Sequence, residues 1–250
     1  MNKEDYVLEG ERLDDLQRNG LHIIQDPADF CFGMDAVLLC GFVSEHQNVR
    51  NGKVLDLCTG NGIIPLLLSA KTDADSIVGI ELRHKAADMA TRSVKLNKLE
   101  DRIKIVEGDI KQAADLITAA SFDIVTVNPP YFKSGHGIVN PDDSKTIARH
   151  EVACSLEDVL REAKRALKEN GLFYMVHKPQ RLVDIFSLMR EEGIEPKTLK
   201  VVYPDRTSPP NMVLIEGRKG SGAELKIEEP LFIYKEDRTY SLEMNTIYGY

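Results

Sequence analysis

The sequence predicts a single α/β domain whose central sheet has seven, mostly parallel strands, with helices on both of its faces. Two observations indicate this fold class. Apolar runs rich in β-branched residues alternate with longer segments of helical periodicity, as they do in successive β–α–β units. In addition, the chain has no internal repeat or low-complexity stretch, and its 250 residues suit one domain of this kind.

The predicted strands are short apolar runs bounded by turn-forming residues. In chain order they are Lys53 to Cys58, Ser76 to Glu81, Arg102 to Val106, Phe122 to Asn128, Gly171 to His177, Leu199 to Tyr203 and Asn211 to Gly217. All of them follow residue 50, so we expect residues 1–50 to form an N-terminal extension packed on a core of residues 51–250.

Helical periodicity predicts helices between these strands. They are Gly62 to Ala70, Lys85 to Lys98, Ser155 to Lys168 and Gln180 to Glu192. Ser155 and Asp158 have the spacing of a capping box. Within the extension, Met34 to Val43 is also helical, and its apolar residues leave little polar surface, which predicts burial.

Two segments interrupt the alternation of strands and helices. Lys133 to Asp143 follows a strand directly and is rich in glycine and proline, so we expect a long loop. Arg206 to Pro210 is the second interruption.

Composition excludes several classes of protein. No apolar run approaches the roughly 18 residues that span a bilayer. Met1 to Asp15 is acidic where a secretory signal is basic and then apolar, so we expect a cytoplasmic protein. The cysteines, Cys31, Cys40, Cys58 and Cys154, form no CxxC pair and have no histidine cluster near them, which favours reduced thiols and no metal site. A net charge of -8 means that any nucleic-acid binding requires a local basic patch.

A glycine-bearing turn follows the first predicted strand, in the segment from Asp56 to Gly62. Gly60 and Gly62 permit positive φ and let a ligand approach the backbone, while the following helix offers unpaired N–H groups. An ordinary strand–helix connection has the same composition, so the turn by itself leaves both interpretations open.

Carboxylates at the ends of the next two strands favour a ligand that contains a ribose. Glu81 lies 25 positions after Asp56, close to the roughly 20-residue spacing at which an acid binds ribose hydroxyls in dinucleotide folds. Asp109 follows the third strand at the same edge of the sheet, where open α/β sheets bind ligands. Asp109 can equally cap the helix that follows it.

The segment Asn128-Pro129-Pro130-Tyr131 is the most specific signal in the sequence. Its prolines have fixed φ and no N–H, so they end the fourth strand in a stiff segment that presents carbonyl and amide oxygens. Such acceptors favour methylation of a planar amine, because hydrogen bonds from its two hydrogens make the nitrogen more tetrahedral and so release its lone pair from conjugation, at on the order of 1 kcal/mol each. Tyr131 can stack on a flipped base. A proline-rich turn with a packed tyrosine is the structural alternative.

These motifs resemble those of the Rossmann-like class I methyltransferases, which use S-adenosylmethionine. The resemblance implies that the glycine turn passes the methionine moiety, that Glu81 holds the ribose and that Asp109 with the Ile110 backbone faces the adenine. Cys58 departs from the pattern, since many relatives have glycine there. The implied cofactor-binding residues are Asp35, Asp56, Cys58, Thr59, Gly60, Asn61, Gly62, Glu81, Leu82, Asp109, Ile110 and Asn128, and the implied catalytic residues are Asn128, Pro129, Pro130 and Tyr131.

Flanking segments narrow the resemblance. Together they are similar to the bacterial tRNA adenine-N6 methyltransferases over nearly the whole chain, and that family modifies the adenine that follows the anticodon of a valine tRNA. The segments are Asp29 to Leu39, Asn128 to Phe132, Ala148 to Glu151, His177 to Leu182 and Val202 to Pro204. The resemblance implies tRNA as the partner, with no obligate protein partner.

Candidate RNA contacts are basic residues in the second half of the chain. Arg149 and His150 follow the predicted loop and are placed to meet phosphate or the target base. Lys178, Arg181 and Arg206 are further candidates, in a patch that would also contain His177, Lys197 and Lys200. Scattered solvated charges are the alternative interpretation. Asp35 either approaches the methionine end of the cofactor or caps its own helix.

Three other functions use the same features. A glutamine-N5 methyltransferase of a release factor has the same acceptor motif, but usually also a separate N-terminal domain, for which about 50 residues are too few. A guanine-N2 methyltransferase of ribosomal RNA more often has phenylalanine after the prolines, where this chain has Tyr131. A non-catalytic module that binds nucleotide or RNA is the alternative outside enzymology.

Overall fold

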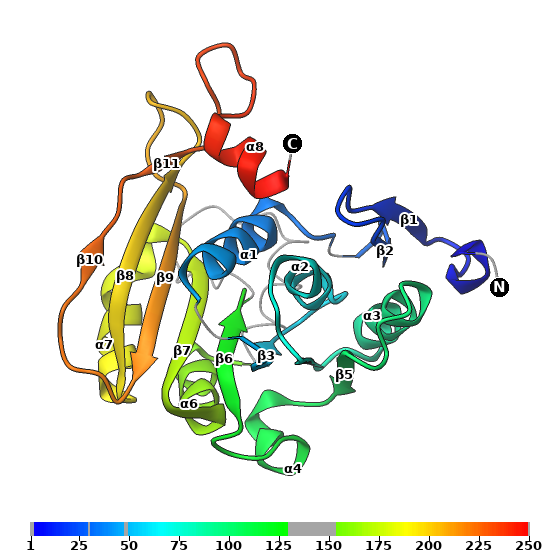
Figure 1. The fold of residues 1–250 in the computed structure, drawn as a ribbon, viewed down its shortest axis with the longest axis horizontal. Helices are drawn as coiled ribbons and strands as arrows, with labels where there is room; N and C mark the ends of the chain where they lie inside the picture. Colours follow the sequence, from blue (N-terminus) through cyan, green and yellow to red (C-terminus); the bar gives the residue numbers. More distant parts are fainter. Residues whose placement is uncertain (1–2, 30, 48–49, 130–153, 250) are drawn as a thin grey trace, which may run out of the picture.

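The computed structural model describes residues 3–29, 31–47, 50–129 and 154–249, and its centre is a large, mostly parallel β-sheet (Figure 1). The seven predicted strands are confirmed, with ends that differ by up to a few residues. They are β3 (Lys53–Leu57), β4 (Ser76–Glu81), β5 (Ile103–Glu107), β6 (Phe122–Val127), β7 (Leu167–His177), β8 (Ile194–Tyr203) and β9 (Met212–Lys219). Their spatial order is β8-β9-β7-β6-β3-β4-β5, and β9 is antiparallel to β7 and β8.

The sheet is larger than the sequence predicted, because two short strands extend it to nine. They are β10 (Lys226–Ile227) and β11 (Leu231–Phe232), and both pair with β8 in parallel. A strand of two residues has no alternation of apolar and polar positions that a sequence pattern can reveal. The C-terminal helix α8 (Leu242–Tyr248), which follows them, was not predicted either.

Helices cover both faces of the sheet, as predicted (Figure 1). On one face lie α1 (Met34–His46), α2 (Ile63–Lys71) and α3 (His84–Leu96), and on the other lie α6 (Leu156–Ala166) and α7 (Leu182–Glu191). A separate cluster of buried apolar side chains fills each face. Short turns of helix, η2 (Ile110–Gln112), α4 (Ala113–Leu116) and η3 (Pro179–Arg181), connect strands to these layers.

Two local predictions about the helices are confirmed. Ser155 and Asp158 form a capping box at the start of α6, in which each side chain accepts the other residue's backbone N–H. In α1, every residue from Ala36 to Val43 is buried, because the helix lies between the sheet and other helices. An apolar residue on any side of α1 is therefore covered.

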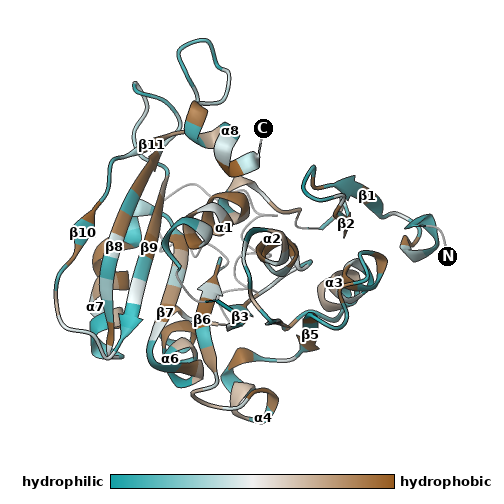
Figure 2. Cartoon of the chain, in the orientation of Figure 1, coloured by the Kyte–Doolittle hydropathy of each residue, from teal (hydrophilic) through white to brown (hydrophobic). Residues whose placement is uncertain are grey.

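The N-terminal extension contains a β-hairpin that the sequence did not predict. It consists of β1 (Arg12–Asp15) and β2 (His22–Gln25), preceded by the short helix η1 (Lys3–Tyr6). Figure 2 shows the polar surface of β1, in contrast to the apolar central strands. The hairpin is joined to α3: Arg92 donates two hydrogen bonds of 2.7 Å to the carboxylate of Glu11, and the Ile24 N–H donates to the hydroxyl of Ser93.

The two predicted interruptions have different outcomes. Arg206 to Pro210 lies in the connection between β8 and β9, as expected. Lys133 to Asp143 lies outside the described residues. Within the parts of the chain that the structure describes, every helix is too short or too polar to cross a membrane.

Candidate active site

The glycine turn and Asn128 lie at the same edge of the sheet. β3 and β6 are adjacent and parallel, and the last pair of their register is Leu57 with Val127. Cys58 and Asn128, which follow these residues, therefore leave the sheet side by side. This is also the point at which the strand order reverses, with β4 on one side of β3 and β6 on the other. Open α/β sheets bind their ligands at such a point.

The turn after β3 has a backbone with repeated left-handed conformation. Cys58, Gly60 and Gly62 have φ of 59°, 58° and 85°. A side chain at Gly62 would meet the Cβ of Ala90 in α3 at 3.0 Å, so glycine is required there for helix packing. At Gly60, by contrast, no atom lies within 4 Å of an added Cβ, which leaves open space for a ligand against the backbone. Cys58 reaches the left-handed region without being glycine, at a cost of roughly 1–2 kcal/mol.

Glu81 connects the ends of β3 and β4. One carboxylate oxygen, Oε2, accepts a 2.9 Å hydrogen bond from the Gly60 N–H, and Oε1 accepts from the Arg83 N–H at 3.0 Å. The guanidinium of Arg83 also contacts Oε1 and forms an ion pair of 2.8 Å with Asp29 from the N-terminal extension. Glu81 is 6% exposed, and a carboxylate has further lone pairs beyond these contacts. It can therefore accept hydrogen bonds from a ligand's hydroxyls.

Asp56 is a buried carboxyl group beneath this turn. Its Oδ1 accepts a 2.7 Å hydrogen bond from the hydroxyl of Thr126 on β6, while its Oδ2 is buried without a hydrogen-bond partner. Burial in the sheet raises the pKa of Asp56 to about 7, because desolvation disfavours the charged form. The group is thus close to the midpoint of its titration at neutral pH.

Asn128 presents an acceptor that no described group uses. Its Oδ1 is buried and has no hydrogen-bond partner. Buried polar atoms are paired in the large majority of cases, so an unpaired acceptor at a ligand edge indicates a donor that binding would supply. Pro129, which follows, is buried, whereas Pro130 and Tyr131 lie outside the described residues.

Two further strand ends complete the edge. Asp109 caps η2, since its Oδ1 accepts from the Lys111 N–H at 2.9 Å, and its Oδ2 lies 3.8 Å from the Lys111 ammonium, which leaves lone pairs for a further donor. Ile110 behind it is buried. Leu82, directly after Glu81, is 45% exposed, which is unusual for a leucine beside a buried acid. An exposed apolar side chain here offers a surface for a flat, apolar ring.

Sequence patterns missed Gln25 in β2. This side chain is 2% exposed, and its Oε1 accepts hydrogen bonds from the Asn61 amide at 3.2 Å and from the Phe32 N–H at 3.0 Å. Its amide nitrogen donates to Asp14. The hydrogen bond between Gln25 and Asn61 joins the N-terminal extension to the glycine turn. A glutamine at the end of a four-residue strand carries no sequence signal for such a role.

Asp35, for which the sequence left two roles open, and Thr59, a predicted cofactor contact, both lie among the described residues. Asp35 lies in the first turn of α1, where its Oδ1 accepts the Ala36 N–H at 2.9 Å, and the cap position is Gly33. Thr59 is buried in the turn, and its N–H donates to the Ile80 carbonyl at 2.9 Å.

The candidate RNA contacts do not gather into one cluster of unpaired charges. Arg181 pairs with Asp184 at 2.7 Å, and the guanidinium of Arg206 lies 4.8 Å from the centroid of the Phe232 ring. Lys178 donates to the Asn211 carbonyl at 3.4 Å. Arg149 and His150 lie outside the described residues.

Two members of the wider patch have local partners or are buried. Lys200 lies within 4 Å of three glutamates, the nearest being Glu243 at 2.5 Å. His177 is 1% exposed, and burial lowers its pKa to about 4, so it is neutral at physiological pH. Neither adds a free positive charge to the surface.

Comparisons with known proteins agree with this geometry. The family model of the methyltransferase small domain matches residues 35–192, more than half of the chain. A tRNA1(Val) (adenine(37)-N6)-methyltransferase of Porphyromonas gingivalis is 32% identical over 70% of this chain and 71% of its own length. The chain belongs to the tRNA1(Val) (adenine(37)-N6)-methyltransferase family. A relative of the same name from Tolumonas auensis is 29% identical over 89% of this chain and 90% of its own length.

Solved structures show the same fold as this methyltransferase. A predicted O-methyltransferase from Agrobacterium tumefaciens superposes with a TM-score of 0.70 at 21% identity, covering 86% of this chain and 96% of that one. The TYW2 protein of M. jannaschii, solved in complex with AdoMet, gives a TM-score of 0.58 at 16% identity, covering 84% and 86%.

The protein is an S-adenosylmethionine-dependent N-methyltransferase. The residues present fit that cofactor. Open space lies against the Gly60 backbone, and a buried carboxylate stands at the end of β4. The predicted combination of fold, cofactor and enzyme class is therefore confirmed.

Proposed function

We propose that this methyltransferase methylates the exocyclic N6 amine of the adenine that follows the anticodon of a valine tRNA. The names of its relatives support this acceptor, since they specify adenine 37 of tRNA1(Val). The observation that carries the proposal within the chain itself is the buried, unpaired Oδ1 of Asn128 beside the glycine turn.

Asn128 acts by accepting a hydrogen bond from the amine. In adenine, the N6 lone pair is delocalised into the ring, so the nitrogen is planar and weakly nucleophilic. An acceptor on each N6 hydrogen, the Asn128 Oδ1 and the Pro129 carbonyl, stabilises the tetrahedral form in which the lone pair can attack. When bound, the cofactor supplies an electrophilic methyl group on a sulfonium. The chain needs no strong general base for this, because the methylated amine loses its proton readily.

The cofactor is held along the carboxyl edge of β3, β4 and β5 in this proposal. The Gly60 backbone borders the methionine moiety, and Glu81 accepts from the ribose hydroxyls with the lone pairs that Gly60 and Arg83 leave unused. Leu82 and Ile110 flank the adenine ring, and Asp109 accepts from its amino group. The remaining cofactor contacts that we propose are Asp35, Asp56, Cys58, Thr59, Asn61 and Gly62.

The other proposed features concern the protein as a whole. We propose that residues 1–50 are an extension of one methyltransferase domain, residues 51–250, and that the enzyme works in the cytoplasm, where its substrate tRNA is found. Pro130 and Tyr131 complete the catalytic segment in this proposal. Arg149, His150, Lys178, Arg181 and Arg206 are its proposed RNA contacts.

A substrate competition tests the acceptor. The protein is mixed with S-adenosylmethionine labelled in its methyl group and with equal amounts of unmodified valine tRNA, the same tRNA with guanine in place of adenine 37, ribosomal RNA and a release factor. We expect label in the unaltered tRNA alone, and N6-methyladenosine on digestion of that RNA. Label in the release factor or in ribosomal RNA would overturn the proposal in favour of glutamine or guanine methylation.

A further inference from the structure

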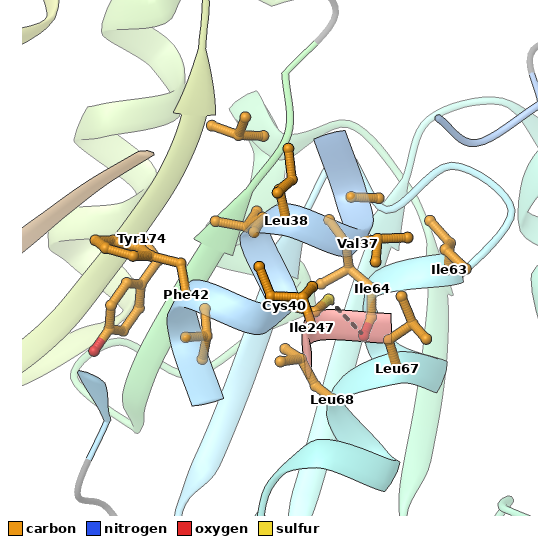
Figure 3. Close-up of a cluster of buried hydrophobic side chains, with 14 of the residues drawn as sticks. Val37, Leu38, Cys40, Phe42, Ile63, Ile64, Leu67, Leu68, Tyr174 and Ile247 are labelled. Atoms are coloured by element: carbon orange, nitrogen blue, oxygen red, sulfur yellow. Dashed lines mark hydrogen bonds between the residues drawn. The ribbon is translucent and has the colours of Figure 1, made fainter. Parts of the chain in front are cut away.

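A groove separate from the residues assigned above lies between the β1–β2 turn and the C-terminal helix α8. It has a volume of about 220 Å³, and its walls come from the β1–β2 turn, α1, α2 and α8. Figure 3 shows Val37, Ile63, Leu67 and Ile247, which line it, converging from α1, α2 and α8. The volume is below the roughly 300–1,000 Å³ of clefts that enclose drug-sized ligands, so the groove can hold part of one nucleotide, such as its phosphate, and does not enclose a larger molecule.

Two cations meet in this groove at one neutral acceptor. Arg18 donates to the carbonyl oxygen of Ile247 at 3.0 Å, and Lys71 donates to the same oxygen at 2.5 Å. Among the described residues, no carboxylate lies within ion-pair distance of either cation. Burial and the charge of Arg18 lower the pKa of Lys71. A backbone carbonyl does not neutralise a cation, so the pair has the charge and the spacing to receive an anionic oxygen.

The acidic group at the groove does not cancel this charge. Asp15 also lines the groove, but it is exposed and its Oδ1 accepts a 2.7 Å hydrogen bond from the Gln17 N–H. Neither Asp15 nor Glu45, whose charge raises the pKa of Lys71, forms an ion pair with Arg18 or Lys71 among the described residues.

A stack of tyrosines leads into the same groove. The rings of Tyr234 and Tyr240 lie 5.5 Å apart at 13°, and those of Tyr240 and Tyr248 lie 5.3 Å apart at 18°. Tyr248 also lines the groove. Stacked aromatic rings beside positive charges are the combination that binds single-stranded nucleic acid, since bases stack on the rings while cations hold the backbone.

The groove shares a wall with the candidate active site. Ile63, which lines it, directly follows Gly62 of the glycine turn, and Phe32, which also lines it, donates its N–H to the Gln25 that holds Asn61. A polynucleotide in the groove therefore lies close to the carboxyl edge of the sheet. The net charge of -8 makes such a local cation pair necessary for RNA binding, because bulk attraction is absent.

We propose that this groove binds a nucleotide of the substrate RNA other than the target adenine, with its phosphate between Arg18 and Lys71 and its base against Tyr248. The assignment rests on the proposed function, in which the substrate is a tRNA. The ligand chemistry is that of a phosphodiester joined to a base, and free phosphate is the simpler source of the same anion.

Charge removal tests the phosphate contact. In the full-length protein, Arg18→Gln with Lys71→Gln should weaken binding of unmodified valine tRNA about 10- to 100-fold and lower the slope of log affinity against log salt by about 2. The affinity for S-adenosylmethionine should stay within about twofold. Lys219→Gln is the matched control, since that lysine also donates to a backbone carbonyl, of Leu167, but is not among the residues that line the groove. Unchanged tRNA affinity and salt slope in the double variant would overturn the proposal.

A second variant tests the stacking, and it keeps the proposal testable if the double variant fails to fold. Tyr248→Leu keeps apolar bulk but removes the ring, and should weaken tRNA binding about 10-fold with little change in salt slope. Inorganic phosphate at millimolar concentration should compete weakly, and full competition by phosphate alone would reassign the groove to free anion. Wild-type methylation of tRNA separates the two proposals. If the wild type methylates tRNA and both variants bind it normally, only the groove assignment fails, whereas a wild type that methylates no tRNA removes both.

Discussion

Oε1 of Gln25 accepts a hydrogen bond from the side-chain amide of Asn61, across 36 positions of sequence. The two side chains are 2% and 3% exposed, so water cannot replace the contact if it is lost. One belongs to the hairpin of the N-terminal extension and the other to the glycine turn. The extension therefore helps to hold the backbone against which the cofactor is proposed to lie.

Replacement of Gln25 by leucine should break this contact between the N-terminal hairpin and the glycine turn. Gln25→Leu leaves the buried Asn61 amide and the partly buried Phe32 N–H without their acceptor, so the free energy of unfolding should fall by about 1–3 kcal/mol. Cofactor affinity should fall severalfold, because the turn loses a fixed partner. Urea denaturation and titration calorimetry measure both effects. The same change at the exposed Gln180 is the control, and equal behaviour of the two variants would contradict the proposed role.

Removal of the Asn128 side-chain acceptor should affect catalysis alone. Asn128→Ala is expected to lower the rate of methyl transfer in single turnovers by about 100-fold or more, since the acceptor stabilises charge that develops during attack. Because Oδ1 has no partner in the described protein, its loss should leave folding and cofactor affinity nearly unchanged. A parallel loss of rate and cofactor affinity would argue against the assignment.

Glu81 should show the opposite behaviour. Glu81→Ala removes the carboxylate proposed to accept from the ribose, so the dissociation constant of the cofactor should rise about 10- to 100-fold. The rate at saturating cofactor should change far less. Glu107 is the matched control, because it faces Glu81 in the register of β4 and β5 but its side chain is 51% exposed and bonds to His84. Cofactor binding that is as weak in Glu107→Ala as in Glu81→Ala would remove the special role of Glu81.

The buried Asp56 should make stability depend on pH. Its folded pKa of about 7 lies above the ordinary value, so the folded state binds the proton more tightly than the unfolded chain. The stabilisation is complete below about pH 4 and is lost as pH rises through 7, by on the order of 4 kcal/mol. Denaturation of the wild type and of Asp56→Asn between pH 4 and 8 measures this difference. Parallel stability curves for the two proteins would show that Asp56 is not protonated on folding.

The sheet and its major helices could be predicted because each is long enough to show a pattern. β4 and β6, for example, are runs of apolar residues whose ends carry Glu81 and Asn128, so the strand and its site residue are read together. The hairpin could not be predicted in this way, because β1 has four residues and three of them are charged. Its stability comes from contacts with α3, such as Arg92 with Glu11, that are distant in sequence.

Some residues of the candidate site could be predicted from the sequence and others could not. Residues at strand ends, such as Glu81 and Asp109, follow from position, since parallel strands bring their carboxyl ends to one edge. Gln25 and Arg83 act through side-chain contacts with residues from other elements, and no local pattern marks them. The groove could not be predicted from local sequence either, because Arg18 and Ile247, which meet there, are 229 positions apart.

The family match begins at residue 35, after both Gln25 and Asp29. The matched residues thus exclude Gln25, which contacts the glycine turn through Asn61, and Asp29, which contacts Arg83 beside Glu81. A protein shortened to start at residue 35 would keep every strand of the large sheet. It would lose the contacts of Gln25 and Asp29, so the glycine turn and Arg83 would be held less firmly. We therefore expect Gln25 and Asp29 to contribute to cofactor binding, although both precede the matched residues.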